Sequence, residues 1–369
     1  MIVSTLYSYK GGAGRTVCSA NLVGSLAKEV GASQRAPLIL MDLDLDSAGL
    51  THMLDSYAEF ENSSWNTAAL IQGRFLLDRS LDRNIFFNRD PRTRLASQTI
   101  KLLVDAGLPA EFLLSMELIE LRKGVGLEIE NLVNRDPSTV VSELKKKNRP
   151  SEKSIRGCLE SLVPAVGAKD ISAKVGAPEG SVLFVGGPQV GSEPIVEGDA
   201  RPNLRRFINE CKKQNVAALL IDSASGRQNI ANLCHGVSDV MIYCTRLTYQ
   251  FRVGTKLQLR YFLNKPTKQN KKKPAVVLLP VAVPAATSKW EKLKNNAMDD
   301  LSGLVRDVQR LTPCYCFFDG VPEIESFKWV EKILRNDLSD DETIAVGVFE
   351  ALAAKIVEIA KERSLLADN

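Results

Sequence analysis

The chain of 369 residues is 44% hydrophobic and 25% charged, which is typical of a globular protein with one large domain or two modest ones. Its net charge of +4 is too small to indicate nucleic-acid binding by itself. No stretch approaches the ~18 consecutive apolar residues of a membrane span, and Met1 leads into an apolar segment without the basic region of a signal peptide. We therefore expect a cytoplasmic protein with no membrane partner.

Cysteine and histidine usage excludes several classes of site. Seven cysteines are scattered without a C-x-x-C pair, so we expect reduced thiols, including Cys314 and Cys316 on one apparent strand. The two histidines, His52 and His235, make a histidine-rich metal site or a Ser-His hydrolase a poor hypothesis.

In chain order, short apolar runs alternate with helical stretches. Residues 2–8 predict a buried strand, and apolar residues recur at helical spacing from Thr16 to about Glu29. Further strands are predicted at 37–41, 181–187, 216–226, 239–244 and 275–283. This alternation predicts an α/β fold with a doubly wound, mostly parallel sheet that is covered on both faces.

The pattern changes between the second and third of these strands. Residues 56–179 contain only segments of helical period, so we predict a helical insertion into one α/β domain formed by residues 1–55 and 180–369. Of the two sections, the insertion is the candidate for a partner-binding surface.

The stretch SYKGGAGRT, Ser8 to Thr16, joins the first strand to the first helix. Glycines at 11, 12 and 14 allow positive φ angles and close approach to an anion, and the helix N-terminus adds a positive dipole. The G-x-x-x-x-G-K-[ST] pattern fails twice, because Tyr9 stands where the first glycine belongs and Arg15 replaces the lysine.

The loop instead resembles the deviant Walker A motif, K-G-G-x-G-K-[ST], of ParA/MinD-type P-loop ATPases, and most closely a bacterial branch with arginine in place of the second lysine. The resemblance covers residues 1–55 and 180–335 and implies a P-loop fold that binds ATP and Mg²⁺. It also implies that Lys10 reaches the phosphates of a partner in a nucleotide-bridged homodimer, as a catalytic residue. The implied nucleotide ligands are Lys10, Gly11, Gly12, Ala13, Gly14, Arg15, Thr16, Val17 and Gly226.

Arg15 is the main departure from the motif. Its guanidinium keeps the positive charge and can bind phosphate oxygens through two nitrogens. Since the charge is kept, we expect nucleotide binding to survive. Because arginine is bulkier than lysine and changes the shape of the site at the γ-phosphate, we expect hydrolysis to be slow.

Three aspartates follow the second strand, at the sheet edge where open α/β folds bind ligands. By resemblance, Asp44 orients or activates the attacking water, and both Asp42 and Asp44 belong to the metal site. We interpret Asp46 as a loop cap. Thr16 completes the metal ligands with its hydroxyl.

The strand ending in Leu220-Ile221-Asp222 has the Walker B pattern, in which the carboxylate contacts Mg²⁺. The following S-A-S-G resembles the family's second switch, where the Gly226 N–H senses the γ-phosphate. Ala224 replaces the branch's arginine. Arg227 then has two interpretations, a phosphate contact or a surface residue, and we favour the second.

Three later features complete the comparison. Gln250 resembles a glutamine in the loop after the family's next strand, and residues 321–334 resemble a late loop and helix of this branch. Leu279-Pro280 replaces the asparagine that reads adenine in many members. Basic runs at 145–149 and 265–273 permit nonspecific DNA binding, but we favour solvated loops. The last helix, about 342–362, has mixed charges and is predicted to pack on the core.

The leading hypothesis is a dimerising Mg-ATP switch with ATPase activity that controls a partner protein. By resemblance to relatives that accompany bacterial effector modules, its role would lie in signalling or antiviral defence. The alternatives are a ParA-like DNA-partition or positioning ATPase and a nucleotide-binding scaffold that does not hydrolyse.

Overall fold

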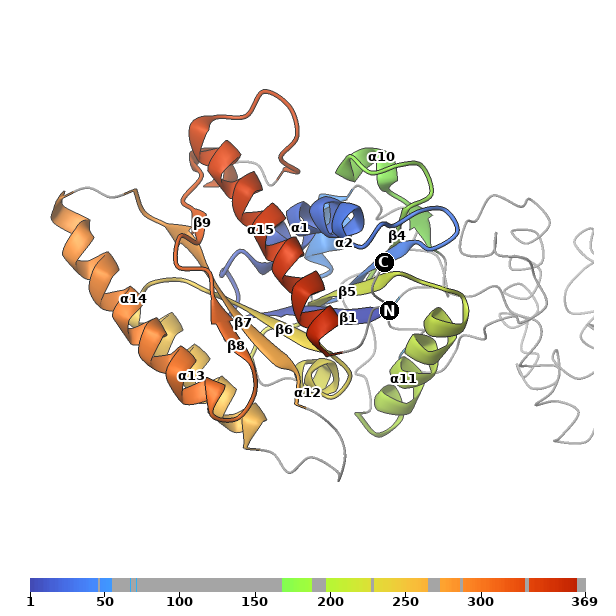
Figure 1. The fold of residues 1–369 in the computed structure, drawn as a ribbon, viewed down its shortest axis with the longest axis horizontal. Helices are drawn as coiled ribbons and strands as arrows, with labels where there is room; N and C mark the ends of the chain where they lie inside the picture. Colours follow the sequence, from blue (N-terminus) through green and yellow to red (C-terminus); the bar gives the residue numbers. More distant parts are fainter. Residues whose placement is uncertain are drawn as a thin grey trace, which may run out of the picture.

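The computed structural model describes residues 1–45, 47–54, 67, 71, 168–187, 197–226, 229–264, 273–285, 288–328 and 332–363. Nine strands of this part of the chain form one sheet, with the path β3-β4-β2-β5-β1-β6-β7-β8 and β9 beside β7. Helices lie on both faces of the sheet (Figure 1). The predicted doubly wound α/β fold is confirmed.

The central strands coincide with the predicted apolar runs. Their bounds are β1 Ile2–Tyr7, β2 Leu38–Leu43, β4 Val182–Val185, β5 Ala218–Ser223, β6 Val240–Thr245 and β7 Ala275–Val283. These six strands pair with one another in parallel. The first five are buried along their whole length, which explains why the runs are continuously apolar rather than alternating.

Three short strands extend the sheet. Antiparallel β3 (Lys169–Asp170) pairs with β4 at one edge. Parallel β8 (Cys314–Cys316) and β9 (Val321–Pro322) pair with β7 at the other. Cys314 and Cys316 lie on a strand as predicted, and the six cysteines within the described residues are free thiols.

One face of the sheet is covered by four helices: α1 Arg15–Glu29, α2 Gly49–Met53, α10 Ser172–Val175 and α15 Asp340–Glu362. The other face is covered by α11 Glu197–Lys213, α12 Asn229–His235, α13 Tyr249–Leu263 and α14 Ser288–Gln309. A 3₁₀ turn, η2 Glu325–Lys328, precedes α15. Helix α15 buries Phe349, Leu352 and Ile356 beside α1, so the prediction of a core-packing final helix is confirmed.

The predicted helical insertion lies almost entirely outside the described residues and stays a prediction. Its last part, 168–179, is described and already belongs to the core, because β3 pairs with β4 and α10 packs on α1. The core therefore resumes at or before residue 168, not at 180. Within the described ranges, no helix combines the length and apolarity needed to span a membrane.

Candidate functional site

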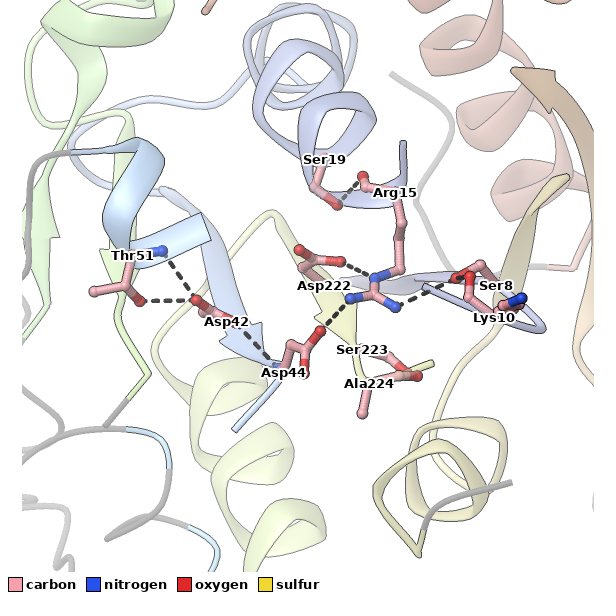
Figure 2. Close-up of polar contacts among 10 residues, drawn as sticks. All are labelled: Ser8, Lys10, Arg15, Ser19, Asp42, Asp44, Thr51, Asp222, Ser223 and Ala224. Atoms are coloured by element: carbon pink, nitrogen blue, oxygen red, sulfur yellow. Dashed lines mark hydrogen bonds and ion pairs between the residues drawn. The ribbon is translucent and has the colours of Figure 1, made fainter. Parts of the chain in front are cut away.

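The glycine-rich loop connects β1 to α1 at the carboxyl edge of the central strands (Figure 2). Gly12 and Gly14 have φ angles of 77° and 79°, as predicted, whereas Gly11 is not in the left-handed region. Gly14 is the N-cap of α1 and offers no side-chain cap. The first N–H groups of α1 therefore remain available to an anion, and the helix dipole favours negative charge there.

Gly14 is also constrained by its neighbour. A Cβ atom at this position would lie 2.8 Å from Cγ1 of Val281 on β7. Left-handed φ and this close approach both require glycine, so the loop shape depends on this residue. Lys10, Gly11 and Gly12 are exposed around it, Gly14 and Thr16 are half-buried, and Ala13 and Val17 are buried.

Arg15 is the centre of the polar network in Figure 2. Its side chain is only 7% exposed, with Nε 2.6 Å from Oδ1 of Asp222 and Nη2 2.5 Å from Oδ2 of Asp44. Its third nitrogen, Nη1, donates to Oγ of Ser8 at 3.4 Å. Burial opposes the charge on Arg15, but the Asp222 and Asp44 carboxylates outweigh it and raise the pKa of the guanidinium.

Asp222 is the second-last residue of β5, beside β1 and β2, where it is fully buried. Burial raises its pKa, although Arg15 and the nearby Thr16 hydroxyl act in the opposite direction. Its second oxygen, Oδ2, has no hydrogen-bond partner among the described residues. A buried carboxylate oxygen in this situation is a ready acceptor for a metal-bound water or a cation.

Asp42 is the register partner of Asp222 on the adjacent strand. Thr51 donates to its Oδ2 from the backbone at 2.9 Å and from Oγ1 at 2.8 Å, and the Asp44 N–H donates to its Oδ1 at 3.1 Å. Burial and the nearby Asp222 raise the pKa of Asp42 to about 7. These contacts make Asp42 a support for the loop that carries Asp44, while its role as a metal ligand stays a prediction.

The predicted second switch lies next to the loop. The Gly226 N–H donates to the carbonyl of Ser8 at 3.0 Å, and the Gly226 carbonyl accepts from the Tyr7 hydroxyl at 2.7 Å. Gly226 has a φ angle of 75°, which favours glycine. The peptide predicted to sense the γ-phosphate is thus held by the start of the phosphate loop. Arg227 and Asp46 lie outside the described residues.

Lys10 takes no part in the carboxylate network. It is exposed, and Figure 2 shows its side chain beside Ser8, whose hydroxyl donates to the Lys10 carbonyl at 3.0 Å. An exposed ammonium at the loop entrance is accessible to a ligand or to a second molecule. Gln250, at the start of α13, is exposed as well.

The oxygen donors fit Mg²⁺ as part of a larger coordination shell. Carboxylates of Asp44 and Asp222 and the hydroxyl of Thr16 are the hard ligands that Mg²⁺ prefers. Within the described ranges, no group of three or more His, Cys, Asp or Glu side chains could hold a metal ion without other ligands. Mg²⁺ retains waters and binds substrate phosphates, so such a partial set suits a metal that arrives with a nucleotide.

Sequence reasoning brought together the loop, Asp42, Asp44, Asp222 and Gly226, and it missed three supporting residues. Thr51 holds Asp42, Tyr7 holds Gly226, and the Tyr9 ring lies so close to Gly254 of α13 that a Cβ there would be 2.1 Å from it. The contacts of Tyr7 and Tyr9 join residues distant in the chain, whereas Thr51 is nine residues from Asp42. All three had a signal, because Tyr7 and Tyr9 belong to the Y-S-Y-K-G-G-x-G-R-[ST] pattern of the loop and Thr51 ends the D-S-A-G-L-T run after the aspartates, but their partners were not predicted.

Comparisons with known proteins bear on the fold. No protein-family model matches the sequence, and no curated protein matches it significantly. The structure of apo McdA from Cyanothece matches at 12% identity and a TM-score of 0.51, covering 97% of this chain and 99% of that one. An ATP complex of a McdA variant from Cyanothece matches at 11% identity and a TM-score of 0.50, covering 98% and 96%.

At this level of identity the similarity establishes the fold alone. The chain has the fold of ParA/MinD-type P-loop ATPases, as the loop motif implied.

Proposed function

We propose that this protein is a Mg-ATP-dependent switch with ATPase activity, which dimerises on binding nucleotide and controls a partner protein. The observation that carries the proposal is the N-terminus of α1. A left-handed Gly14 leaves its N–H groups uncapped, and Arg15 and Thr16 stand beside Asp44 and Asp222. The N–H groups and Arg15 can donate hydrogen bonds to the phosphates of a metal–triphosphate complex, and the carboxylates can bind its metal.

Each residue has a role in this proposal. The loop amides and Arg15 bind phosphate oxygens, while Thr16, Asp222 and Asp44 hold Mg²⁺ directly or through water. When bound, Mg²⁺ would neutralise charge on the phosphate oxygens. Asp44, half-buried after β2, orients the attacking water, and Asp42 supports it through the Asp44 N–H.

Dimerisation is assigned to Lys10. It is exposed at the entrance of the loop and points away from the carboxylates in Figure 2. Such a position suits a cation that contacts the phosphates of a second protomer, which is the role implied by the resemblance to the deviant Walker A motif. The similarity to an ATP complex of McdA supports ATP as the nucleotide.

Two variants separate binding, dimerisation and hydrolysis. We expect wild-type protein to double its mass by light scattering in Mg-ATP and to release phosphate slowly. Lys10→Ala should bind nucleotide and stay monomeric, whereas Asp44→Ala should dimerise and release phosphate at least about tenfold more slowly. A monomeric wild type with bound Mg-ATP would refute the dimerisation step.

A non-hydrolysing scaffold is favoured by one observation. Arg15 engages Asp44, the residue assigned to water activation, through a 2.5 Å contact. If that contact persists with nucleotide bound, Asp44 cannot orient water. Phosphate release that stays at the Asp44→Ala level, alone and with co-purified partners, would support the scaffold over the ATPase.

The remaining hypotheses stay predictions. The basic run at 145–149 and most of that at 265–273 lie outside the described residues, as does nearly all of the helical insertion proposed to bind the partner. A gel shift with nonspecific DNA, with and without ATP, tests the positioning ATPase. Isolation of the native complex tests the partner and the proposed role in signalling or defence.

A further inference from the structure

We propose that Arg15 acts as an internal cation that excludes free Mg²⁺ from Asp44 and Asp222, so that metal and nucleotide bind together and not the metal alone. This inference rests on the proposed function and assigns Arg15 a second role beyond phosphate binding. The guanidinium has two alternative sets of partners, the carboxylates and the phosphates, and it exchanges one for the other when nucleotide binds.

The geometry of the contacts supports the first position. Arg15 bonds one carboxylate through Nε and the other through Nη2, at 2.6 Å and 2.5 Å. Its side chain is 7% exposed, and those of Asp222 and Asp44 are 0% and 14% exposed. These charges interact in a medium of low dielectric constant, where a divalent cation on the same carboxylates would be strongly repelled by the guanidinium.

The choice of arginine supports the same conclusion. A planar guanidinium has separate N–H edges and bonds two carboxylates at once, whereas a lysine ammonium is a compact point charge. Arg15 is the first residue of α1, directly after the loop. Rotation about its side-chain bonds therefore moves the charge between the acidic strand ends and the loop amides without moving the helix.

A triphosphate removes the obstacle to the metal. The triphosphate oxygens are new bidentate partners for the guanidinium. The triphosphate also arrives with Mg²⁺ already coordinated by its oxygens. Asp222 Oδ2, buried and without a hydrogen-bond partner in the described chain, is then available to the metal shell.

Gly226 has a similar internal partner. Its N–H donates to Ser8 O at 3.0 Å, so it must leave that acceptor before it can bind a phosphate. Arg15 and the Gly226 N–H, two of the groups predicted to bind the phosphate tail, are therefore engaged by the protein itself, which is what a two-position site requires.

The test measures the unfolding temperature and the binding heat of the full chain with MgCl₂ alone, with ATP in EDTA, and with both. Wild-type protein should gain stability only when both are present, and should give no binding heat with MgCl₂ alone. Arg15→Ala should unfold at a lower temperature in EDTA and regain stability with MgCl₂ alone. Arg35→Ala, which removes an exposed arginine, should behave as wild type.

Arg15→Lys covers the case in which Arg15→Ala does not fold. Because one ammonium cannot satisfy both carboxylates equally, we expect Arg15→Lys to bind Mg²⁺ at least about tenfold more tightly than wild type. The proposal would be overturned if wild type gave binding heat with MgCl₂ alone and this heat disappeared in Asp222→Asn. It would also be overturned if MgCl₂ alone changed neither the binding heat nor the unfolding temperature of the Arg15 variants. If Mg-ATP stabilises neither wild type nor variants, the proposed function itself fails.

Discussion

Gly14 shows how a single residue connects backbone geometry to ligand binding. Its φ angle of 79° shapes the loop, and the absence of a Cβ lets the loop approach Val281 on β7. Because both requirements arise at the N-cap of α1, a change here alters the helix end that is proposed to bind phosphate.

The first prediction compares two glycines of this loop. Gly14→Ala should lower the free energy of unfolding by at least about 1–2 kcal/mol, since a left-handed residue with a Cβ is strained and this Cβ also contacts Val281. Gly11→Ala is the matched control, because its Cβ would meet nothing within 4 Å and its φ is not left-handed. Equal losses in urea unfolding of the two variants would contradict this account.

At this scale the sequence predicts the identity of site residues better than their contacts. The loop could be found from its pattern because it is contiguous in the sequence. The aspartates Asp42, Asp44 and Asp222 could be found because they lie at or after the ends of apolar runs, and parallel pairing brings those ends together. The partners of Arg15 could not be predicted from the sequence, because a guanidinium binds carboxylates as well as phosphates. Which carboxylates Arg15 contacts depends on the pairing of β2 with β5, which brings the segment after β2 beside Asp222.

Helices α1 and α10 approach each other closely at a glycine. A Cβ on Gly24 of α1 would lie 2.3 Å from the carbonyl oxygen of Val175, the last residue of α10. The glycine therefore lets two backbones meet, and it joins α1 to the end of the segment 56–179 that the sequence analysis assigned to the insertion. Neither β3 nor α10 could be predicted, because segments of two and four residues carry no measurable periodicity.

A pair of helix glycines tests this contact. Gly24→Ala should destabilise the protein by about 1–3 kcal/mol, because a backbone atom must shift to admit the methyl group. Gly347→Ala in α15 has nothing within 4 Å of its Cβ and should stabilise by about 0.5–1 kcal/mol through helix propensity. Thermal unfolding of both variants measures these stability changes. A Gly24→Ala variant as stable as wild type would show that α10 does not pack as described.

The capping box of α15 gives a prediction about pH. Ser339 Oγ accepts from the Glu342 N–H, and Glu342 accepts from the Ser339 N–H at 3.0 Å. The Lys332 ammonium and the Ser326 hydroxyl, both 2.7 Å from Glu342, together with this N–H lower the pKa of Glu342 from 4.5 to about 2. A pKa lower in the folded than in the unfolded state stabilises the fold above pH 4.5, and this contribution is lost as the pH falls toward 2.

Glu342→Gln isolates that charge while keeping a side-chain acceptor for the N-cap. We expect the variant to be about 1 kcal/mol less stable than wild type at pH 7, and the difference to shrink below pH 4.5 and vanish near pH 2. Urea unfolding of both proteins at pH 7, 4 and 3 measures it. A difference that does not change with pH would show that packing, not charge, is responsible.

At the scale of the whole molecule, the order of the strands assembles the site. β1 lies between β5 and β6, and β2 lies beside β5, so the loop after β1, the aspartates after β2 and Asp222 on β5 meet at one edge. This convergence could be predicted, since continuous apolar runs that alternate with helices imply a parallel sheet. The order of the edge strands and the return point of the core could not, because short strands depend on tertiary pairing.

We propose that the loop after β1 and the acidic ends of β2 and β5 together bind a Mg-nucleoside triphosphate. Calorimetry with Mg-ATP on wild type, Asp222→Asn and the surface control Arg35→Ala tests it most directly. We predict saturable heat of equal size for wild type and Arg35→Ala, and binding weakened at least about tenfold in Asp222→Asn. No heat from wild type at millimolar Mg-ATP, or the same affinity in Asp222→Asn, would contradict it.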